Sequence, residues 1–494
     1  RFDGDMADIA DAASGQERAA GPEWLLTGIA YFGCACLVCL LCIVAFVFAT
    51  RKNPLLDLGY FVYVNTALGQ WIHNLQLAQV RQRAAEARKA GEASGAFHSA
   101  VESLEVSICP TADESDGVEV TVIPLPCLKD NYVSASHPWK MLRKADGLPS
   151  TAFAVDVADA EVLFGTLREV EGSTGRAVHL THVLITHRHM DHCGGLALLL
   201  SEWASERPGR RCPEVVASAL DPTPHATRQV WEGATVHLTQ HGDGFAPGST
   251  ADCLVAHVRG VPGHTRGHLW FYVTTAGSPS RHRDLPAECA GRVRSIAEFS
   301  DAKCGKCPGI LFSGDTLFVG GIGRLFEGQP SQMVTNLYRV GGAAVGAGST
   351  GAPSEFVDTH LPLDALVLTG HEYSVDNLDF CRWLLPENGA VQAKRAWCLS
   401  RREGSPPRCT AVTTLREEAS FNVFMMCHDP ALRGALAALG AATLSKARNG
   451  SEIDVDGCLA TIQGARQEAA SFDKTLLAAT LGLLRALKDC SAHK

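Results

Sequence analysis

Short apolar runs that end in polar turns recur along the chain between residues 118 and 373. Val118 to Pro126 alternates like a half-buried strand, whereas Ala152 to Val157 and Ala177 to Ile185 carry the apolar and β-branched residues of buried strands. Ala158 to Val170 has the character of a helix. Strands that alternate with helices in this way predict an α/β fold.

A different pattern precedes this region. Residues 24–50 contain no charged side chain over 27 positions, which exceeds the roughly 20 needed to cross a bilayer. We expect a transmembrane anchor behind a tail at 1–23, with a buried core helix as the alternative. Arg51 and Lys52 follow the run and only Arg18 stands close before it, which predicts that the bulk of the chain is cytosolic.

The composition excludes one class of function and indicates a compartment. The net charge of −9 argues against a nucleic-acid partner, because phosphate neutralisation needs a concentrated basic face. The 18 cysteines show no repeating framework, so most are expected to be free thiols in a reducing compartment. Cys304 and Cys307 form a lone CxxC, which we interpret as two thiols in a surface loop.

One short segment concentrates residues that bind metals. His187, His189, Asp191 and His192 form the pattern HxHxDH directly after a predicted buried strand. Burying such a side chain without a partner destabilises the fold by on the order of several kcal/mol each. A bound metal ion supplies the partner and removes this penalty. The first two histidines fall on one side of an extended chain, and a turn can bring the other two residues back, so the pattern can address two ions.

Three later segments end a strand with a ligand-type residue beside a glycine. They place His264 in a Pro/Gly turn, Asp315 after the run ILFSG, and His371 after the run ALVLTG. Each alone is as consistent with an ordinary loop histidine or capping aspartate. Together with HxHxDH they indicate a metal-dependent centre.

These segments resemble glyoxalase II, the hydroxyacylglutathione hydrolases of the metallo-β-lactamase superfamily. The resemblance spans most of residues 120–430 and the last fifteen or so, and it rests on these motifs: IPLPCLKDNY, THRHMDHCGG, VPGHTRGH, LFSGDTLFVGGIGRLFEG, LTGHEYSVDNLDF, TTLREEASFNVF and LLRALKD. It implies an αββα sandwich at 118–373 and a C-terminal helical substrate-binding domain at 374–494. The composition of residues 51–117 predicts a helical or flexible linker. Two stretches depart from the family's pattern: 276–308 separates two expected neighbouring strands, and 430–470 lengthens the C-terminal helical part. We interpret both as surface excursions.

The resemblance also implies a ligand set and a reaction. His187, His189 and His264 would hold one divalent ion, Asp191, His192 and His371 a second, and Asp315 would bridge them. Ligands without thiolate suit zinc, which we expect, or iron or manganese. A hydroxide between the ions, held by Asp191 and Asp315, would hydrolyse S-lactoylglutathione to D-lactate and glutathione, the second step of methylglyoxal removal.

The substrate contacts match the family less completely. Arg324, Phe326 and Tyr373 stand where the resemblance implies substrate-binding residues, but Phe326 lacks the usual phenol. Met426 stands where a cation is expected, and losing such a contact could weaken binding by roughly 1.5 to 3 kcal/mol. This motivates the hypothesis that the chain binds glutathione weakly or prefers a less anionic thiol conjugate.

Other functions remain open at this point. A persulfide dioxygenase of the same superfamily also carries HxHxDH, but it uses a single iron and lacks the segment that supplies His371. A nucleic-acid-cleaving relative would use the same ions but would need a basic surface. A membrane-tethered scaffold with a structural or inactive site would have no reason to keep all seven ligand positions in an open geometry. We expect a monomer that acts on a small thioester.

Overall fold

The computed structural model describes residues 68, 71–75, 78–79, 82, 104–109, 118–127, 131–138, 150–238, 254–275, 305–341, 361–404, 408–465 and 473–490. The chain separates into two compact units, 1–61 and 62–494. The predicted anchor at 24–50 lies outside the described residues. Among the residues that are described, no helix is both long enough and apolar enough to span a bilayer.

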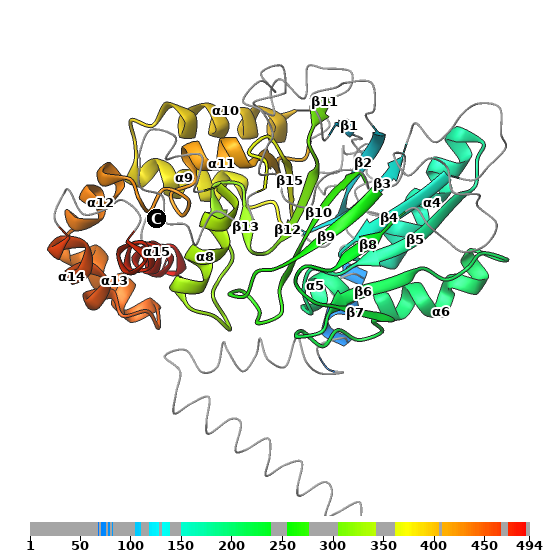
Figure 1. The fold of residues 1–494 in the computed structure, drawn as a ribbon, viewed down its shortest axis with the longest axis horizontal. Helices are drawn as coiled ribbons and strands as arrows, with labels where there is room; N and C mark the ends of the chain where they lie inside the picture. The colour runs from blue at the N-terminus through cyan, green and yellow to red at the C-terminus, as the bar shows by residue number, and fades with distance from the viewer. Residues whose placement is uncertain are drawn as a thin grey trace, which may run out of the picture. The chain divides into compact units, whose positions relative to one another are not determined.

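Two mixed sheets lie face to face in the larger unit (Figure 1). The first sheet has the order β11-β1-β2-β3-β4-β5-β6-β7, and the second has the order β16-β15-β12-β10-β9-β8. The strands of the first are β1 (Leu104–Ile108), β2 (Val118–Cys127), β3 (Asn131–Pro138), β4 (Ser150–Val155), β5 (Val178–Leu184), β6 (Glu214–Ser218), β7 (Arg228–Val230) and β11 (Gly305–Cys307). Those of the second are β8 (Thr235–His237), β9 (Leu254–Gly260), β10 (Leu269–Thr275), β12 (Ile310–Gly314), β15 (Leu366–Thr369) and β16 (Val412–Thr414). A small hairpin of β13 (Leu317–Phe318) and β14 (Gly321–Ile322) follows β12.

Strand β10 shows why the two sheets stay together. Its residues alternate between two hydrophobic cores: Phe271 faces the core between the sheets, whereas Trp270 and Tyr272 face the helices outside. Between the sheets, Phe153 of β4 meets Phe312 of β12 edge to face at 5.9 Å. A strand buried on both faces must be apolar throughout, which explains the unbroken run LWFYV.

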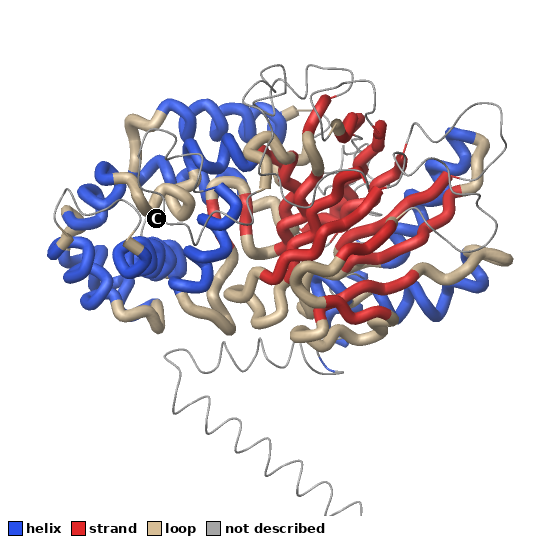
Figure 2. Tube along the Cα trace, viewed as in Figure 1, coloured by secondary structure: helices blue, strands red, loops and turns tan. Residues whose placement is uncertain are grey.

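Helices cover the outer faces, as Figure 2 shows in blue. Against the first sheet pack α4 (Ala160–Thr174) and α6 (Leu196–Glu206), with the single turn α5 (Met190–Cys193) before α6. Helix α4 begins at Asp159, whose carboxylate accepts hydrogen bonds from the backbone N–H groups of Glu161 and Val162. It ends at Gly175, which adopts a left-handed φ of 66°. The observed layers agree with the predicted αββα sandwich.

The second sheet is covered by a helical region. It comprises α8 (Pro330–Gly341), α9 (Ser374–Leu384), α10 (Gly389–Glu403), α11 (Leu415–Phe421), α12 (Pro430–Ala437), α13 (Ala441–Gly450), α14 (Val455–Gly464) and α15 (Lys474–Asp489). Leu432, Leu444 and Ile462 are buried in the same core as α15. Residues 430–465 therefore lengthen the helical region as expected, but the interpretation as a surface excursion is wrong for them because they contribute to the core; residues 466–470 lie outside the described residues.

Two strands of the first sheet lie in segments that were not predicted to contain strands. Strand β1 lies within the predicted linker and pairs with β2 and β11. Strand β11 lies within the predicted insertion at 276–308, and its Cys307 is buried. Cys307 is therefore a strand residue, contrary to the surface-loop interpretation, whereas Cys304 lies outside the described residues.

A buried carboxylic acid joins the helical region to the sheet region. Glu418 of α11 is fully buried and accepts hydrogen bonds from the backbone N–H of Gly320 and from the Asn422 amide. Its other oxygen, Oε1, has no hydrogen-bond partner among the described residues. Burial raises the pKa of Glu418 to about 8, although its hydrogen bonds lower it in part.

We predict that Glu418 makes the free energy of unfolding depend on pH. The folded state holds a proton that the unfolded state releases near pH 4.5. The stabilising contribution is therefore complete below that value and is lost as pH rises toward 8, by at most about 1.4 kcal/mol per pH unit. Glu418→Gln keeps both hydrogen bonds, so the difference between variant and wild type in chemical unfolding should grow in favour of the variant from about pH 5 to about pH 8. A difference that stays constant with pH would contradict this assignment.

Candidate metal centre

All seven predicted ligand residues lie where strand ends of the two sheets meet. His187 and His189 follow β5, and Asp191 and His192 lie in α5. The remaining three come from the second sheet: His264 follows β9, Asp315 follows β12, and His371 follows β15. Segments separated by up to 184 positions in the sequence therefore supply one cluster.

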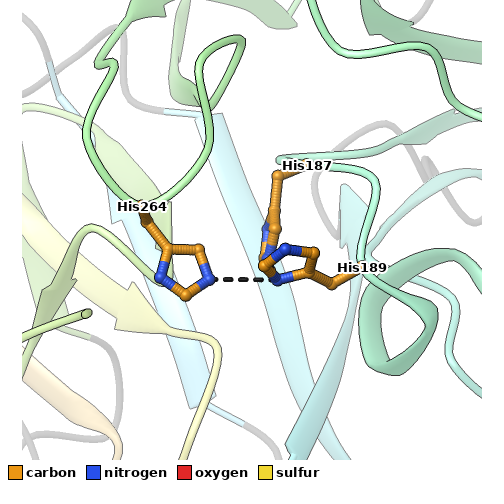
Figure 3. Close-up of side chains that lie close together, drawn as sticks. All are labelled: His187, His189 and His264. Atoms are coloured by element: carbon orange, nitrogen blue, oxygen red, sulfur yellow. Dashed lines mark hydrogen bonds between the residues drawn. The ribbon is translucent and has the colours of Figure 1, made fainter. Parts of the chain in front are cut away.

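The first trio consists of His187, His189 and His264 (Figure 3). His189 Nδ1 lies 2.9 Å from His187 Nε2 and 3.1 Å from His264 Nε2. His264 Nδ1 must donate to the Arg324 carbonyl oxygen at 2.9 Å, which leaves a lone pair on its Nε2. Two or three imidazole lone pairs that face one another repel unless a cation lies among them.

The second trio consists of Asp191, His192 and His371. The two Nε2 atoms of His192 and His371 lie 3.3 Å apart, and Asp191 Oδ2 lies 3.5 Å from His371 Nε2. Asp315 lies between the trios: its Oδ1 is 3.2 Å from His192 Nε2, and its Oδ2 is 3.5 Å from His264 Nε2. The arrangement fits a metal centre, because nitrogen and oxygen donors of one chain converge without thiolates.

Burial sets the charge of the first trio. It lowers the pKa of His187 and His189 well below the ordinary histidine value, and neighbouring imidazoles lower it further. Both rings are therefore neutral near pH 7, which is the form that binds a metal.

The region around Asp315 is anionic. Burial lowers the pKa of His192, but the carboxylates of Asp315 and Asp156 outweigh it and raise that pKa well above its ordinary value. Burial raises the pKa of Asp315, but the imidazoles of His371 and His192 outweigh it and hold that pKa well below its ordinary value. The carboxylates that favour a proton on His192 would also attract a divalent cation.

Asp156 orients these ligands, and the sequence reasoning missed it. Its carboxylate lies 2.8 Å from His192 Nδ1 and accepts from the Thr186 hydroxyl and backbone N–H, both at 2.7 Å. The aspartate is buried and adopts a φ of +57°, which is rare outside glycine. The signal in the sequence was a single acid in the apolar run AFAVDV.

His268 is a second residue that sequence reasoning did not assign. It is fully buried, its ring stacks on His187 with centroids 4.7 Å apart, and its Nε2 accepts from the backbone N–H of Asp315 at 3.1 Å. The adjacent Gly314 has a φ of +49°, and a Cβ there would lie 2.5 Å from Thr186 Oγ1. Glycine is therefore required where this strand end passes the HxHxDH loop.

An ion-pair network fastens the HxHxDH loop to its neighbours. Arg188, between two ligands, pairs with the fully buried Asp221 at 3.0 Å and with Glu327. Asp221 also accepts from the Thr265 hydroxyl at 2.7 Å, and Glu327 accepts from the Arg266 backbone N–H at 2.8 Å. The loops that carry the first trio are therefore tied to each other through side chains that point away from the metal cluster.

The predicted substrate residues surround the cluster. Phe326 contacts His264 and His189, with ring centroids 5.2 and 6.1 Å apart, and covers the first trio. Tyr373 stacks on His371 at 4.8 Å beside the second trio and is partly exposed. The Arg324 side chain is half exposed, and its Nε lies 3.5 Å from Asp489 of α15.

Met426 lies in the interior of the protein, away from solvent. Its side chain is buried in the core of the helical region. Helix α15 carries a cation close to Arg324, because Arg485 pairs with the same carboxylate, Asp489, as Arg324 does. The hypothesis of weak glutathione binding stays a prediction, and the missing phenol of Phe326 is the observation at the cluster that motivates it.

Comparison with known proteins identifies the family to which this chain belongs. The family model described as "Hydroxyacylglutathione hydrolase C-terminus" matches residues 372–451. A hydroxyacylglutathione hydrolase of Synechococcus sp. is 33% identical over 63% of this chain and 91% of its own length. One of Cupriavidus taiwanensis is 30% identical over 66% and 94%. The chain belongs to the hydroxyacylglutathione hydrolase family.

Solved structures of lower similarity include metallo-β-lactamases. One from Staphylococcus aureus is 15% identical, with a TM-score of 0.33 over 69% of each chain. The BLEG-1 B3 enzyme is 16% identical, with a TM-score of 0.31 over 62% of this chain and 99% of its own. Divalent metal binding follows from membership of the hydroxyacylglutathione hydrolase family together with the ligand groups described above.

We predict that Asp156→Asn lowers the metal affinity of the second trio about ten- to a hundredfold. The asparagine amide would donate toward His192 Nδ1 and so place the ring proton on Nε2, where the metal must bind. Chelator competition followed by elemental analysis measures the loss. Asp159→Asn is the matched control, because asparagine also caps α4 well. Wild-type affinity in Asp156→Asn would refute the orienting role.

Proposed function

We propose that this chain hydrolyses S-(2-hydroxyacyl)glutathione thioesters, such as S-lactoylglutathione, to a 2-hydroxy acid and glutathione. The observation that carries the proposal is the pair of ligand trios joined by Asp315 in a member of the hydroxyacylglutathione hydrolase family. D-lactate would be the product from the lactoyl substrate, which places the chain in methylglyoxal detoxification.

The centre is proposed to hold two divalent ions. His187, His189 and His264 would bind one, Asp191, His192 and His371 the other, and Asp315 both. We expect zinc, with iron or manganese as alternatives that the same donors accept. Bound ions would supply a water of lowered pKa and would polarise the thioester carbonyl. A mono-iron persulfide dioxygenase needs one ligand trio, so the second trio favours hydrolysis.

The chain's own residues would position the substrate. Phe326 and Tyr373 present ring surfaces on the two sides of the cluster, so a thioester between them lies over the ligands. Arg324 offers an exposed guanidinium for a glutathione carboxylate, with Arg485 close behind it. The departing thiolate has an ordinary pKa near about 8 to 9 and needs no dedicated acid.

The location is also a proposal. The uncharged run at 24–50 would anchor the chain in a membrane, with the enzyme on the cytosolic side and acting as a monomer. The supporting observation is the length of the run and the basic pair Arg51 and Lys52 that follows it. Protection of the C-terminal part from protease in sealed membranes would test the orientation.

We predict that Asp315→Ala lowers kcat on S-lactoylglutathione about a hundredfold or more, because it removes the group shared by both trios. Elemental analysis should show fewer than two ions per chain. Asp364→Ala, which removes an exposed pair with Arg416, is the control and should keep both activity and metal. Full activity in Asp315→Ala, or one ion per wild-type chain with persulfide oxidation, would overturn the proposal.

Arg324→Gln should raise KM for S-lactoylglutathione and leave kcat nearly unchanged. Loss of one charge-assisted contact of about 1.5 to 3 kcal/mol corresponds to roughly a ten- to hundredfold increase. A neutral thioester without the glutathione carboxylates should show the same KM with both proteins. Arg382→Gln, on the exposed face of α9, is the matched control. An equal effect on both substrates would show that Arg324 has a structural role only.

A further inference from the structure

Exposed apolar side chains gather at the edge of the first sheet where its parallel strands end. Strands β4, β5, β6 and β7 run parallel, so their carboxyl ends share one edge. Leu220 follows β6 and Trp231 follows β7 at this edge, and each is more than half exposed, at 52% and 59%. Neither side chain is used by the metal centre or by the hydrophobic cores.

A helix from the predicted linker lies at the same edge. Residues 68, 71–75, 78–79 and 82 are helical, and we call them the Trp71 helix. His73 is fully buried there, and its Nε2 donates to the carbonyl oxygen of Ala158, just beyond β4, at 3.0 Å. A Cβ on Gly194, at the end of α5, would lie 2.6 Å from that same nitrogen. The blue segment in Figure 1 accordingly lies beside α5.

Docking through His73 turns the opposite face of the Trp71 helix outward. Leu68, Trp71 and Leu75 share that face, because they are spaced three and four residues apart. They are 52%, 58% and 42% exposed. Of the seven large hydrophobic residues that are exposed in the described part of the chain, five therefore lie at this edge. We call these five residues the apolar edge: Leu68, Trp71, Leu75, Leu220 and Trp231.

The sequence around the Trp71 helix indicates what covers this edge. Only 17 residues separate Thr50, the end of the uncharged run, from Leu68. Such a tether keeps the helix within about 60 Å of the end of that run. Residues 51–90 contain six Lys or Arg against two Asp or Glu, in a chain whose net charge is −9. A basic segment beside exposed Trp and Leu is the pattern of a helix that lies in the surface of an anionic bilayer.

We propose that the apolar edge rests on the surface of an anionic lipid bilayer. Trp71 and Trp231 enter the region between headgroups and acyl chains, where tryptophan is favoured. The Trp71 helix thereby links the membrane surface to α5, which carries Asp191 and His192. The strand ends that hold the metal ligands face the bilayer, and the enzyme has one fixed orientation on it. This inference concerns placement and does not depend on the thioester reaction.

The test uses tryptophan quenching in the full chain. The protein is reconstituted into vesicles of phosphatidylcholine and phosphatidylglycerol whose acyl chains are brominated near the headgroup, and the quenched fraction of fluorescence is measured. The chain has 8 tryptophans. Trp71→Phe and Trp231→Phe should each reduce the quenched fraction. Trp383→Phe, in the helical region, is the control and should leave it unchanged or raise it.

Three further measurements distinguish the possible outcomes. Trp24→Phe reports on the uncharged run alone. If only this variant loses quenching, the uncharged run contacts lipid but the apolar edge does not, and the proposal is overturned. Native mass spectrometry tests whether a second copy of the chain covers the apolar edge. A wild-type dimer that the double variant Leu68→Ser, Leu75→Ser converts to a monomer would also overturn the proposal.

Hydrolysis of S-lactoylglutathione in detergent should be the same in all tryptophan variants, which shows that they are folded. Because quenching needs no turnover, failure here and failure of the proposed reaction are distinguishable.

Discussion

The convergence of five imidazoles and two carboxylates in one buried place is the constraint on which the rest of this structure depends. Ring nitrogens stand 2.9 to 3.3 Å apart, a distance at which lone pairs repel unless a proton or a cation lies between them. No single segment could hold them there, because the ligands come from four strand ends in two sheets. The two-sheet sandwich therefore holds the ligands in place. Its packing also offsets the unfavourable free energy of bringing these polar groups together in the interior.

Three of the predicted ligands are held by partners outside the ligand set. Asp156 fixes the ring of His192, the Arg324 carbonyl fixes His264, and His268 holds the backbone of Asp315. These contacts determine which ring nitrogen carries the proton and therefore which one is left to bind metal. The backbone of Asp156 has a strained, positive φ. Such a conformation persists only where the surrounding contacts hold it in place.

The helical region acts on the site from the other side. Helix α15 brings Arg485 beside Arg324, and Glu418 fastens α11 to the hairpin that follows Asp315. The proposed substrate-binding surface would thus combine residues more than 150 positions apart, and it would depend on the docking of helices that carry no predicted metal ligand. The Trp71 helix makes a comparable connection through α5, which would orient the whole centre toward a membrane.

The sequence by itself determined the strands, the ligand types and their order. Short unbroken apolar runs and the HxHxDH, GH, GD and GHE segments are local signals, so β5, β10, β12 and β15 and the seven predicted ligand positions could be read without coordinates. It did not determine what depends on contacts between distant segments. Asp156 looked like a strand residue and residues 430–470 looked like an insertion, because burial and hydrogen-bond partners are set by packing. Met426 looked like a missing cation for the same reason: only the tertiary structure shows that its side chain lies in a core and that Arg485 of α15 shares Asp489 with Arg324.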